Sequence, residues 1–253
     1  MTPAPLDPSD LAPAEARVEP DQPHAVALAA LADGIRAGDV AVGHGAEDVG
    51  LGSVVVIDYI GWTDGVVWDA SYRRPAPERF RVGDDRTPAA WSTGLVGMRA
   101  GGVRQLEVSP PDDADPTTPP AAPMVVELAV RAVYTPPLPM WRAAYHPVAG
   151  GIEAVDLVIG DGPALTPGMG ISVDYVGWLP DGTEFDTTWR WPEPFRWTWG
   201  EGQVQWEQAL AGMAVGGRRQ LRIPAAAAFG PEGRPAVIPP DADLILTVDV
   251  HPR

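Results

Sequence analysis

A phenolic hydroxyl, a phenyl ring and a carboxylate occur within one short stretch, residues 171–186, at Tyr175, Phe185 and Asp186. If this stretch folds as a strand, a turn and a returning strand, the three groups meet at one end of a sheet. Three of the four phenylalanines of the chain lie in the same half: Phe185, Phe195 and Phe229. The residue types indicate an aromatic pocket, and the alternative is an ordinary hydrophobic core.

The segment that carries Tyr175 alternates apolar and polar side chains, which is typical of a half-buried β-strand. One side of the strand is apolar and the other polar, formed respectively by Ile171, Val173 and Tyr175 and by Ser172 and Asp174. The turn that follows, residues 179–182, contains a Pro that fixes one φ angle and a Gly that can adopt φ > 0. We therefore expect Phe185 and Asp186 to return toward Tyr175.

The same pattern occurs earlier in the chain. Asp58-Tyr59-Ile60-Gly61-Trp62 matches Asp174-Tyr175-Val176-Gly177-Trp178 at a spacing of 116 residues, and a Gly-Met motif at Gly97 matches one at Gly212 at a spacing of 115. A period this long indicates two whole domains, because solenoid repeats are roughly 20 to 50 residues long.

Each copy contains one short amphipathic segment. Its apolar residues lie at positions i, i+4 and i+7, as Trp91, Leu95 and Met98 and as Trp206, Leu210 and Met213. One helix among several strands predicts an α+β domain in which a sheet curls around the helix.

Composition limits the classes of function. The formal net charge of -16 disfavours nucleic acid as a partner, because its phosphates would be repelled. The chain has no cysteine and four scattered histidines, so we expect neither thiolate catalysis nor a metal site. It has no apolar run of 18 residues and begins with an acidic, Pro-rich stretch, which favours a cytoplasmic protein with no membrane partner.

The predicted organisation follows from these patterns. Residues 1–22 are an acidic, Pro-rich arm expected to be disordered, and residues 23–37 have apolar positions at helical spacing and are predicted to form a short helix. Residues 38–135 form the first domain, residues 136–151 a Pro- and Gly-rich linker, and residues 152–253 the second domain.

The second copy resembles the FKBP-type peptidyl-prolyl isomerase domain over nearly its whole length. The matching segments are Val173–Gly177, Asp181–Asp186, Pro194-Phe195, Trp206-Glu207, Leu210–Met213, Ala228–Gly230 and Val237–Leu244. The resemblance implies an antiparallel sheet wrapped around a short helix, in agreement with the pattern analysis. It implies isomerisation of Xaa-Pro bonds in peptides or unfolded proteins, which breaks no bond and needs no cofactor.

The resemblance also assigns site residues. Trp206 would lie under the proline ring and Asp186 at the pocket edge, with Tyr175 and Phe229 completing the catalytic set. Further positions would bind substrate: Phe185, Phe195, Val204, Val237, Ile238 and Leu246. The segment before Trp206 is shorter than in most family members, and Phe229 and Arg234 replace a usual Tyr and a frequent His, which favours low activity or unusual substrates.

The first copy resembles the family less closely. It keeps five matching pocket positions: Tyr59, Trp68, Asp69, Phe80 and Trp91. Residues 110–120, where the family has a loop with an aromatic residue, are rich in Pro and Asp and contain no aromatic residue. We therefore expect a degenerate, non-catalytic domain with a relic pocket.

The leading prediction is a tandem FKBP-like protein that acts as an isomerase in protein folding through its second domain. The alternative is a non-catalytic binding or chaperone module for Pro-containing or macrocyclic ligands such as macrolides. A third reading, a structural adaptor, rests on the degenerate first copy and the acidic arm.

Overall fold

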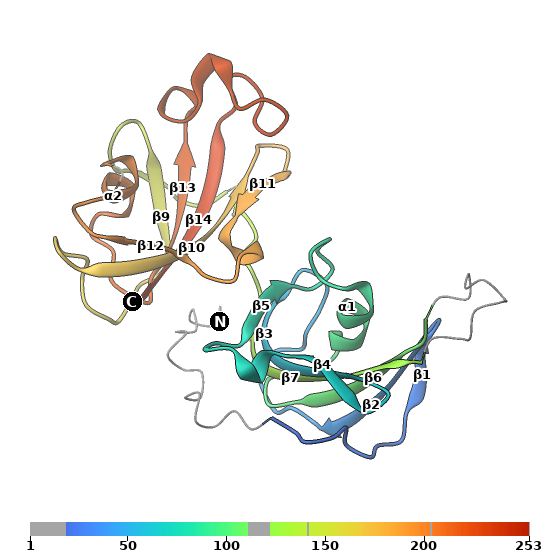
Figure 1. Cartoon of the computed structure of the whole chain (residues 1–253). Coiled ribbons are helices and arrows are strands. Elements are labelled where there is room, and N and C mark those ends of the chain that lie inside the picture. Colours follow the sequence, from blue (N-terminus) through green and yellow to red (C-terminus); the bar gives the residue numbers. More distant parts are fainter. Residues whose placement is uncertain (1–18, 111–121, 141, 203, 253) are drawn as a thin grey trace. The chain divides into compact units, whose positions relative to one another are not determined.

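The computed structural model describes residues 19–110, 122–140, 142–202 and 204–252. The chain divides between Thr135 and Pro136 into two units, each with its own sheet (Figure 1). We call these units the N-terminal and C-terminal domains. The predicted arm lies almost wholly outside the described residues, as do residues 111–120 of the predicted Pro-rich loop.

The N-terminal domain has a seven-stranded antiparallel sheet in the order β1-β2-β6-β7-β3-β4, with β5 also paired to β3. Its elements are β1 (Ala29–Ala32), β2 (Ile35–Ala41), β3 (Val54–Thr63), β4 (Val66–Ala70), the 3₁₀ helix η3 (Ser71–Arg73), β5 (Glu78–Arg81), α1 (Ala89–Leu95), β6 (Val103–Val108) and β7 (Met124–Tyr134).

The C-terminal domain repeats this plan with the order β11-β10-β14-β13-β9-β8, and β12 also pairs with β10. Its elements are β8 (His146–Pro147), β9 (Glu153–Val158), β10 (Gly170–Trp178), β11 (Glu184–Thr187), η4 (Thr188–Arg190), β12 (Phe195–Thr198), α2 (Val204–Leu210), β13 (Arg218–Ile223), η5 (Ala225–Ala227), η6 (Gly230–Glu232) and β14 (Leu244–Pro252).

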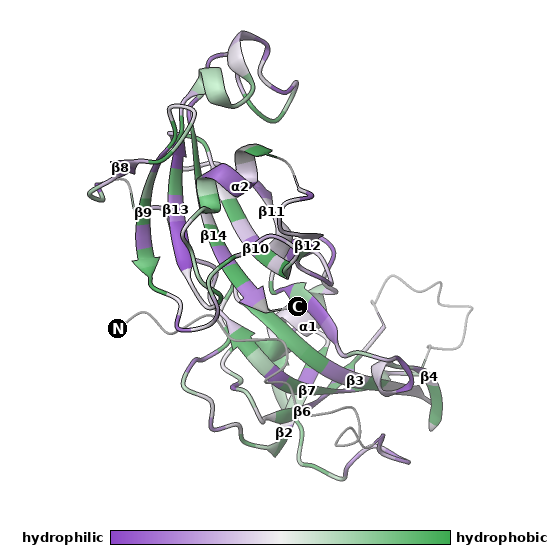
Figure 2. Cartoon of the chain, turned by 90° about the vertical axis from the view of Figure 1, so that its left-hand side faces the viewer, coloured by the Kyte–Doolittle hydropathy of each residue, from purple (hydrophilic) through white to green (hydrophobic). Residues whose placement is uncertain are grey.

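One short α-helix lies over the inner face of each curled sheet in the described chain (Figure 1). Hydrophobic and hydrophilic residues alternate along the strands of the C-terminal sheet (Figure 2), so one face can pack on the helix. Its core contains Ile171 and Val173 from β10 together with Leu210 and Met213 from the helix and the turn after it. The predicted α+β class, two antiparallel sheets each with a short helix, is confirmed.

The predicted helix at residues 23–37 is wrong, because β1 and β2 form a hairpin there. The hairpin turns at Gly34, whose φ is +67°. Because β2 pairs with β6, its backbone groups have hydrogen-bond partners in the sheet. Gly38 lies within β2, where a Cβ would come within 2.5 Å of the Ala27 carbonyl oxygen. The helical spacing of alanine and leucine in this segment favours a helix less than the pairing with β6 favours a strand.

The predicted linker, residues 136–151, contributes to the C-terminal sheet. His146 and Pro147 form β8, which pairs with β9. The amide of Met140 donates to Gln220 Oε1 at 2.7 Å, and Gln220 Nε2 donates to the Met140 carbonyl at 3.1 Å. The segment is therefore bound along much of its length to the domain that follows it.

The predicted half-buried character of the strand that carries Tyr175 is also wrong, because the polar side of β10 is buried as well. Ser172 and Asp174 are 2% and 3% exposed. A buried carboxylate requires partners, and Asp174 has them in Thr188 and His251.

Candidate functional site

Tyr175 and Asp186 are brought together by the antiparallel pairing of β10 with β11. The Tyr175 hydroxyl donates to Asp186 Oδ2 at 2.9 Å, and the Thr187 amide donates to Asp186 Oδ1 at 2.9 Å. Burial raises the pKa of Tyr175 well above its ordinary value, and its hydrogen bond to the Asp186 carboxylate raises the pKa further. The phenol therefore stays neutral and keeps its proton for donation.

Aromatic rings surround this pair. The ring of Trp206, in α2, lies 5.4 Å from that of Tyr175, with an angle of 51° between the planes. Phe185 lies against Gly177, where a Cβ would come within 2.5 Å of Phe185 Cζ. Tyr175, Phe185 and Trp206 are half-buried and pack against the core. Part of each side chain thus remains accessible to a ligand.

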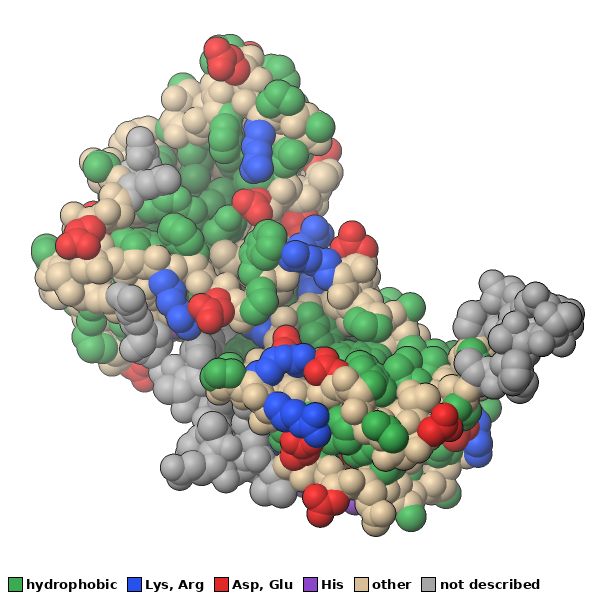
Figure 3. All heavy atoms as spheres, viewed as in Figure 1, with side chains coloured by type: hydrophobic (Ala, Val, Ile, Leu, Met, Phe, Trp, Pro, Cys, Tyr) green, Lys and Arg blue, Asp and Glu red, His purple; other side chains and the backbone are tan. Residues whose placement is uncertain are grey.

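The face of the C-terminal domain seen in Figure 3 has a hollow in which hydrophobic side chains gather, on the side of α2 and β11. Such a concave apolar surface with a few polar groups is typical of a small-ligand site. Within the part of the chain that the structure describes, no group of three His, Asp and Glu side chains is arranged to hold a metal ion.

The other predicted site residues divide by exposure. Ile238 and Leu246 are buried at 3% and 7% exposure and belong to the core against which the pocket aromatic rings pack. Four residues are exposed at the surface: Phe195, Val204, Phe229 and Val237. The Phe195 ring lies 5.3 Å from that of Trp197, a half-buried residue that the sequence analysis did not single out.

The short segment before α2 is held by Glu207. Its Oε1 atom accepts hydrogen bonds from the amides of Gly200 at 2.7 Å and Gly202 at 2.9 Å. Gly202 packs against the Trp197 indole, since a Cβ there would lie 2.5 Å from Trp197 Nε1. The role of Glu207 was not predicted, although a carboxylate in the first turn of a predicted helix is a capping signal.

A buried chain of hydrogen bonds supports Tyr175 from behind. The Tyr175 amide donates to Thr188 Oγ1 at 2.8 Å, and Thr188 Oγ1 donates to Asp174 Oδ1 at 2.7 Å. His251 Nε2 lies 3.1 Å from Asp174 Oδ2. These contacts fix the strand that carries Tyr175 relative to the 3₁₀ turn after Asp186.

The N-terminal domain repeats this support with different residues. The Tyr59 amide donates to Ser71 Oγ at 2.8 Å, and Ser71 Oγ donates to Asp58 Oδ1 at 3.0 Å. Arg131 Nε donates to Asp58 Oδ2 at 2.8 Å and so replaces His251. The hydroxyl at Ser71 and Thr188 is the sequence signal that could have revealed this motif, because it recurs in both copies.

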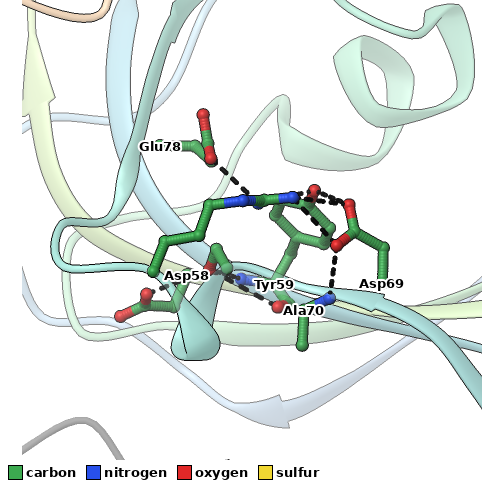
Figure 4. A network of polar contacts seen from close by, with 7 residues as sticks. Asp58, Tyr59, Asp69, Ala70 and Glu78 are labelled. Carbon is green, nitrogen blue, oxygen red and sulfur yellow. Dashed lines mark hydrogen bonds and ion pairs between the residues drawn. The ribbon is translucent and has the colours of Figure 1, made fainter.

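The predicted relic pocket residues also lie together. The Tyr59 hydroxyl donates to Asp69 Oδ2 at 2.5 Å, as Figure 4 shows, and the rings of Tyr59 and Trp91 are 4.6 Å apart in an edge-on arrangement. Phe80 lies 6.1 Å from Trp91, and Trp68 packs on Gly61. The hydrogen bond from Tyr59 is the main cause that lowers the pKa of Asp69.

Strand register shows how the two pockets differ. Phe80 pairs with Val55 as Trp197 pairs with Ile171, so Phe80 corresponds to Trp197. Glu78 therefore stands where the C-terminal domain has Phe195. A carboxylate has replaced one apolar side chain of the pocket.

A curled antiparallel sheet over one short helix, with a tyrosine–carboxylate pair beside a helix tryptophan, defines one class of small α+β domain that occurs twice in this chain. The family described as FKBP-type peptidyl-prolyl cis-trans isomerase matches residues 45–127 and 162–251. The chain belongs to this family. The predicted tandem FKBP-like architecture and the enzyme class are confirmed at the level of the family.

Individual relatives cover different shares of the chain. FK506-binding protein 4 of Dictyostelium discoideum is 42% identical over 100 residues, which are 40% of this chain and only 28% of that protein. The FK506-binding protein of Neisseria meningitidis serogroup B is 41% identical over 103 residues, which are 40% of this chain and 94% of that protein. The solved structure of the three FKBP domains of wheat FKBP73 covers 89% of this chain and 98% of its own, at 22% identity and a TM-score of 0.41.

Proposed function

We propose that the C-terminal domain catalyses cis-trans isomerisation of Xaa-Pro bonds in peptides or unfolded proteins. The observation that carries the proposal is the neutral, hydrogen-bonded Tyr175–Asp186 pair beside the half-exposed ring of Trp206, in a chain that belongs to an isomerase family.

The reaction is a rotation about the amide bond and breaks no bond. Rotation about the amide has a barrier of about 18 to 20 kcal/mol, because the C–N bond has partial double-bond character. The twisted amide loses resonance and is less polar than the planar one, so a water-poor aromatic surface favours it relative to the ground state. No nucleophile is required.

Each side chain then has a defined task. Trp206 provides a flat surface under the pyrrolidine ring, and Phe185 provides a wall beside it. Asp186 accepts a hydrogen bond from the Tyr175 hydroxyl and thereby fixes the direction of the phenol. Phe195, Phe229 and Val237 are exposed and would contact the residues that flank the proline.

A second candidate function, binding of Pro-containing or macrolide ligands without turnover, is favoured by the segment before α2. The amides of Gly200 and Gly202 both donate hydrogen bonds to Glu207. Neither amide can therefore donate to a substrate carbonyl while the Xaa-Pro bond rotates. The name FK506-binding protein, carried by relatives, fits this candidate equally well.

Exchange spectroscopy on a prolyl peptide separates the two candidates. Substoichiometric protein should produce exchange cross-peaks between the cis and trans proline signals, and Trp206→Phe should weaken them. Broadening and shifts from binding without exchange cross-peaks would favour the binding module.

A further inference from the structure

A Pro-x-x-Pro-x sequence precedes each domain at the same position of the repeat. Residues 20–24 are Pro-Asp-Gln-Pro-His and residues 136–140 are Pro-Pro-Leu-Pro-Met, so both prolines match at a spacing of 136 − 20 = 116 residues. The same spacing relates Asp58 to Asp174. We call these two segments the N-terminal and C-terminal straps, and their spacing makes them part of the repeat.

The straps are buried on their proline side. Proline fixes its own φ near about −65° and favours an extended residue before it, so such a segment adopts a polyproline II helix with about three residues per turn. Residues three apart then lie on one side. Pro136 is buried and Pro139 half-buried, whereas Leu138 is 80% exposed. Pro20 and Pro23 are half-buried, and the two residues between them are exposed.

The C-terminal strap ends on a glutamine of the sheet. Gln220 Nε2, in β13, donates to the Met140 carbonyl at 3.1 Å, and Gln220 Oε1 accepts from the Met140 amide at 2.7 Å. One side-chain amide therefore binds both polar groups of one strap residue. The next residue, Leu221, lies in the core under the helix, so Gln220 lies on the opposite face of the sheet.

The N-terminal strap is bound at the equivalent place by two side chains. Gln105, which is 220 − 105 = 115 residues before Gln220, donates through Nε2 to the His24 carbonyl at 2.9 Å. The His24 amide donates to Glu127 Oε1 at 2.6 Å, and His24 Nδ1 lies 2.8 Å from Glu127 Oε2. Glu127 pairs with Gln105 as Thr247 pairs with Gln220. One site thus combines a carboxylate with a histidine, and the other combines a threonine with a methionine.

The chain that follows His24 continues over the same face of the sheet. Gly38, in β2, pairs with Gln105, and side chains of paired residues lie on one face. A Cβ at Gly38 would come within 2.5 Å of the Ala27 carbonyl oxygen and within 3.2 Å of Val26 Cγ2. The absence of a side chain at Gly38 therefore lets the chain lie directly on the sheet.

We propose that the sheet face opposite the helix carries, in each domain, a binding site for an extended Pro-x-x-Pro-x peptide segment, and that the chain fills both sites with its own straps. Gln105 and Gln220 are 4% and 0% exposed, so a vacated site would leave buried amides without these partners. Trp206 belongs to the helix side of the C-terminal sheet. The strap site is therefore separate from the aromatic pocket and independent of catalysis there.

A free peptide tests the site in the full chain. Met140→Pro removes the amide that donates to Gln220 and so weakens the C-terminal strap. In this variant the peptide acetyl-PPLPM-amide should shift the NMR signals of the Gln220 side-chain amide saturably. The same peptide with an N-methylated methionine should bind about fivefold more weakly, because it lacks one hydrogen bond. The Gln105 side-chain amide, which the N-terminal strap occupies, is the control within the spectrum and should not move.

Leu138→Ala is the matched control variant, because the Leu138 side chain is exposed. Its strap stays bound, so the peptide should cause no saturable shift at Gln220. The Thr187 amide reports the aromatic pocket, since it donates to Asp186. A shift at Thr187 without one at Gln220 in folded Met140→Pro overturns the proposal. No saturable shift at either place, or equal affinity for the two peptides, overturns it as well.

Hydrogen exchange in the unmodified chain covers the case in which Met140→Pro does not fold. After correction for intrinsic rates, the Met140 and His24 amides should exchange markedly more slowly than the Leu138 and Gln22 amides, because only the former donate to the sheet face. Gln220→Leu should accelerate exchange at Met140 and leave His24 unchanged. Equal rates within each strap, or equal acceleration at both positions in Gln220→Leu, overturns the proposal.

Discussion

The Tyr175 hydroxyl donates to the carboxylate of Asp186 across two paired strands, at 2.9 Å. Because β10 also carries Gly177, on which Phe185 rests, the same short stretch of sheet sets the phenol, the carboxylate and the phenyl wall. A displacement of any one of these groups is therefore expected to shift the other two.

The Tyr175 phenol should titrate well above an ordinary tyrosine. Its pKa is raised first by burial and then by Asp186, so Asp186→Asn should lower it. A raised pKa favours the neutral form in the folded state; the stability it contributes is therefore present below about pH 10 and lost as the pH rises through the folded value. Phenolate absorbance, compared with Tyr175→Phe, measures this titration, and an unchanged pKa in Asp186→Asn would contradict the assignment.

Gly177→Ala should disturb the pocket through Phe185. A Cβ at this position would meet the Phe185 ring at 2.5 Å, and such overpacking typically costs about 1 to 3 kcal/mol. We expect lower isomerase activity and a lower unfolding temperature. The matched control is Gly61→Ala, in which the Cβ meets Trp68 at 2.2 Å in the other domain. That variant should lose stability and keep its activity; equal loss of activity in both would argue against a site in the C-terminal domain.

His251 should position the strand that carries Tyr175. His251→Leu removes one partner of the buried Asp174, and an unmet buried hydrogen bond is expected to cost about 1 to 3 kcal/mol in free energy of unfolding. His251→Arg should restore most of this loss, because Arg131 makes the equivalent contact with Asp58. Chemical denaturation gives the free energies. If Arg is no better than Leu at this position, the proposed equivalence of the two supports fails.

Asp69 should stabilise the N-terminal domain at neutral pH. Its pKa is lowered mainly by the Tyr59 hydrogen bond and also by Arg74, so its contribution is present above the unfolded value of about 4 and lost as the pH falls through the folded value. Asp69→Asn should therefore melt at a lower temperature than the wild type at pH 7, and the difference should shrink on acidification. A difference independent of pH would indicate a loss of packing alone.

Much of the architecture could be predicted from the sequence because the two copies confirm one another. The motif around Tyr59 and Tyr175 and the helical spacing of Trp91 and Trp206 each recur, so chance patterns could be set aside. The segment 23–37 has no second copy with the same composition, and its helical spacing was misleading because pairing with β6 is a tertiary effect.

The pocket itself was only partly predictable. Tyr175, Phe185, Asp186 and Trp206 do converge, but burial of Asp174 depends on His251, which is 77 residues away in the sequence. Arg74 could not be assigned to the N-terminal pocket from sequence, because a surface arginine after a turn is commonplace. Its contacts with Asp69, Tyr59 and Glu78 are found only in the structure.

The most direct test of the central claim is the kcat/KM for cis-trans isomerisation of a prolyl peptide by the full chain, measured for the wild type, Asp186→Ala and Asp69→Ala. These two variants remove the same carboxylate from the two domains. We expect Asp186→Ala to lose most of the activity and Asp69→Ala to keep it. Equal activity of all three proteins, or no acceleration by the wild type, would contradict the assignment of catalysis to the C-terminal domain.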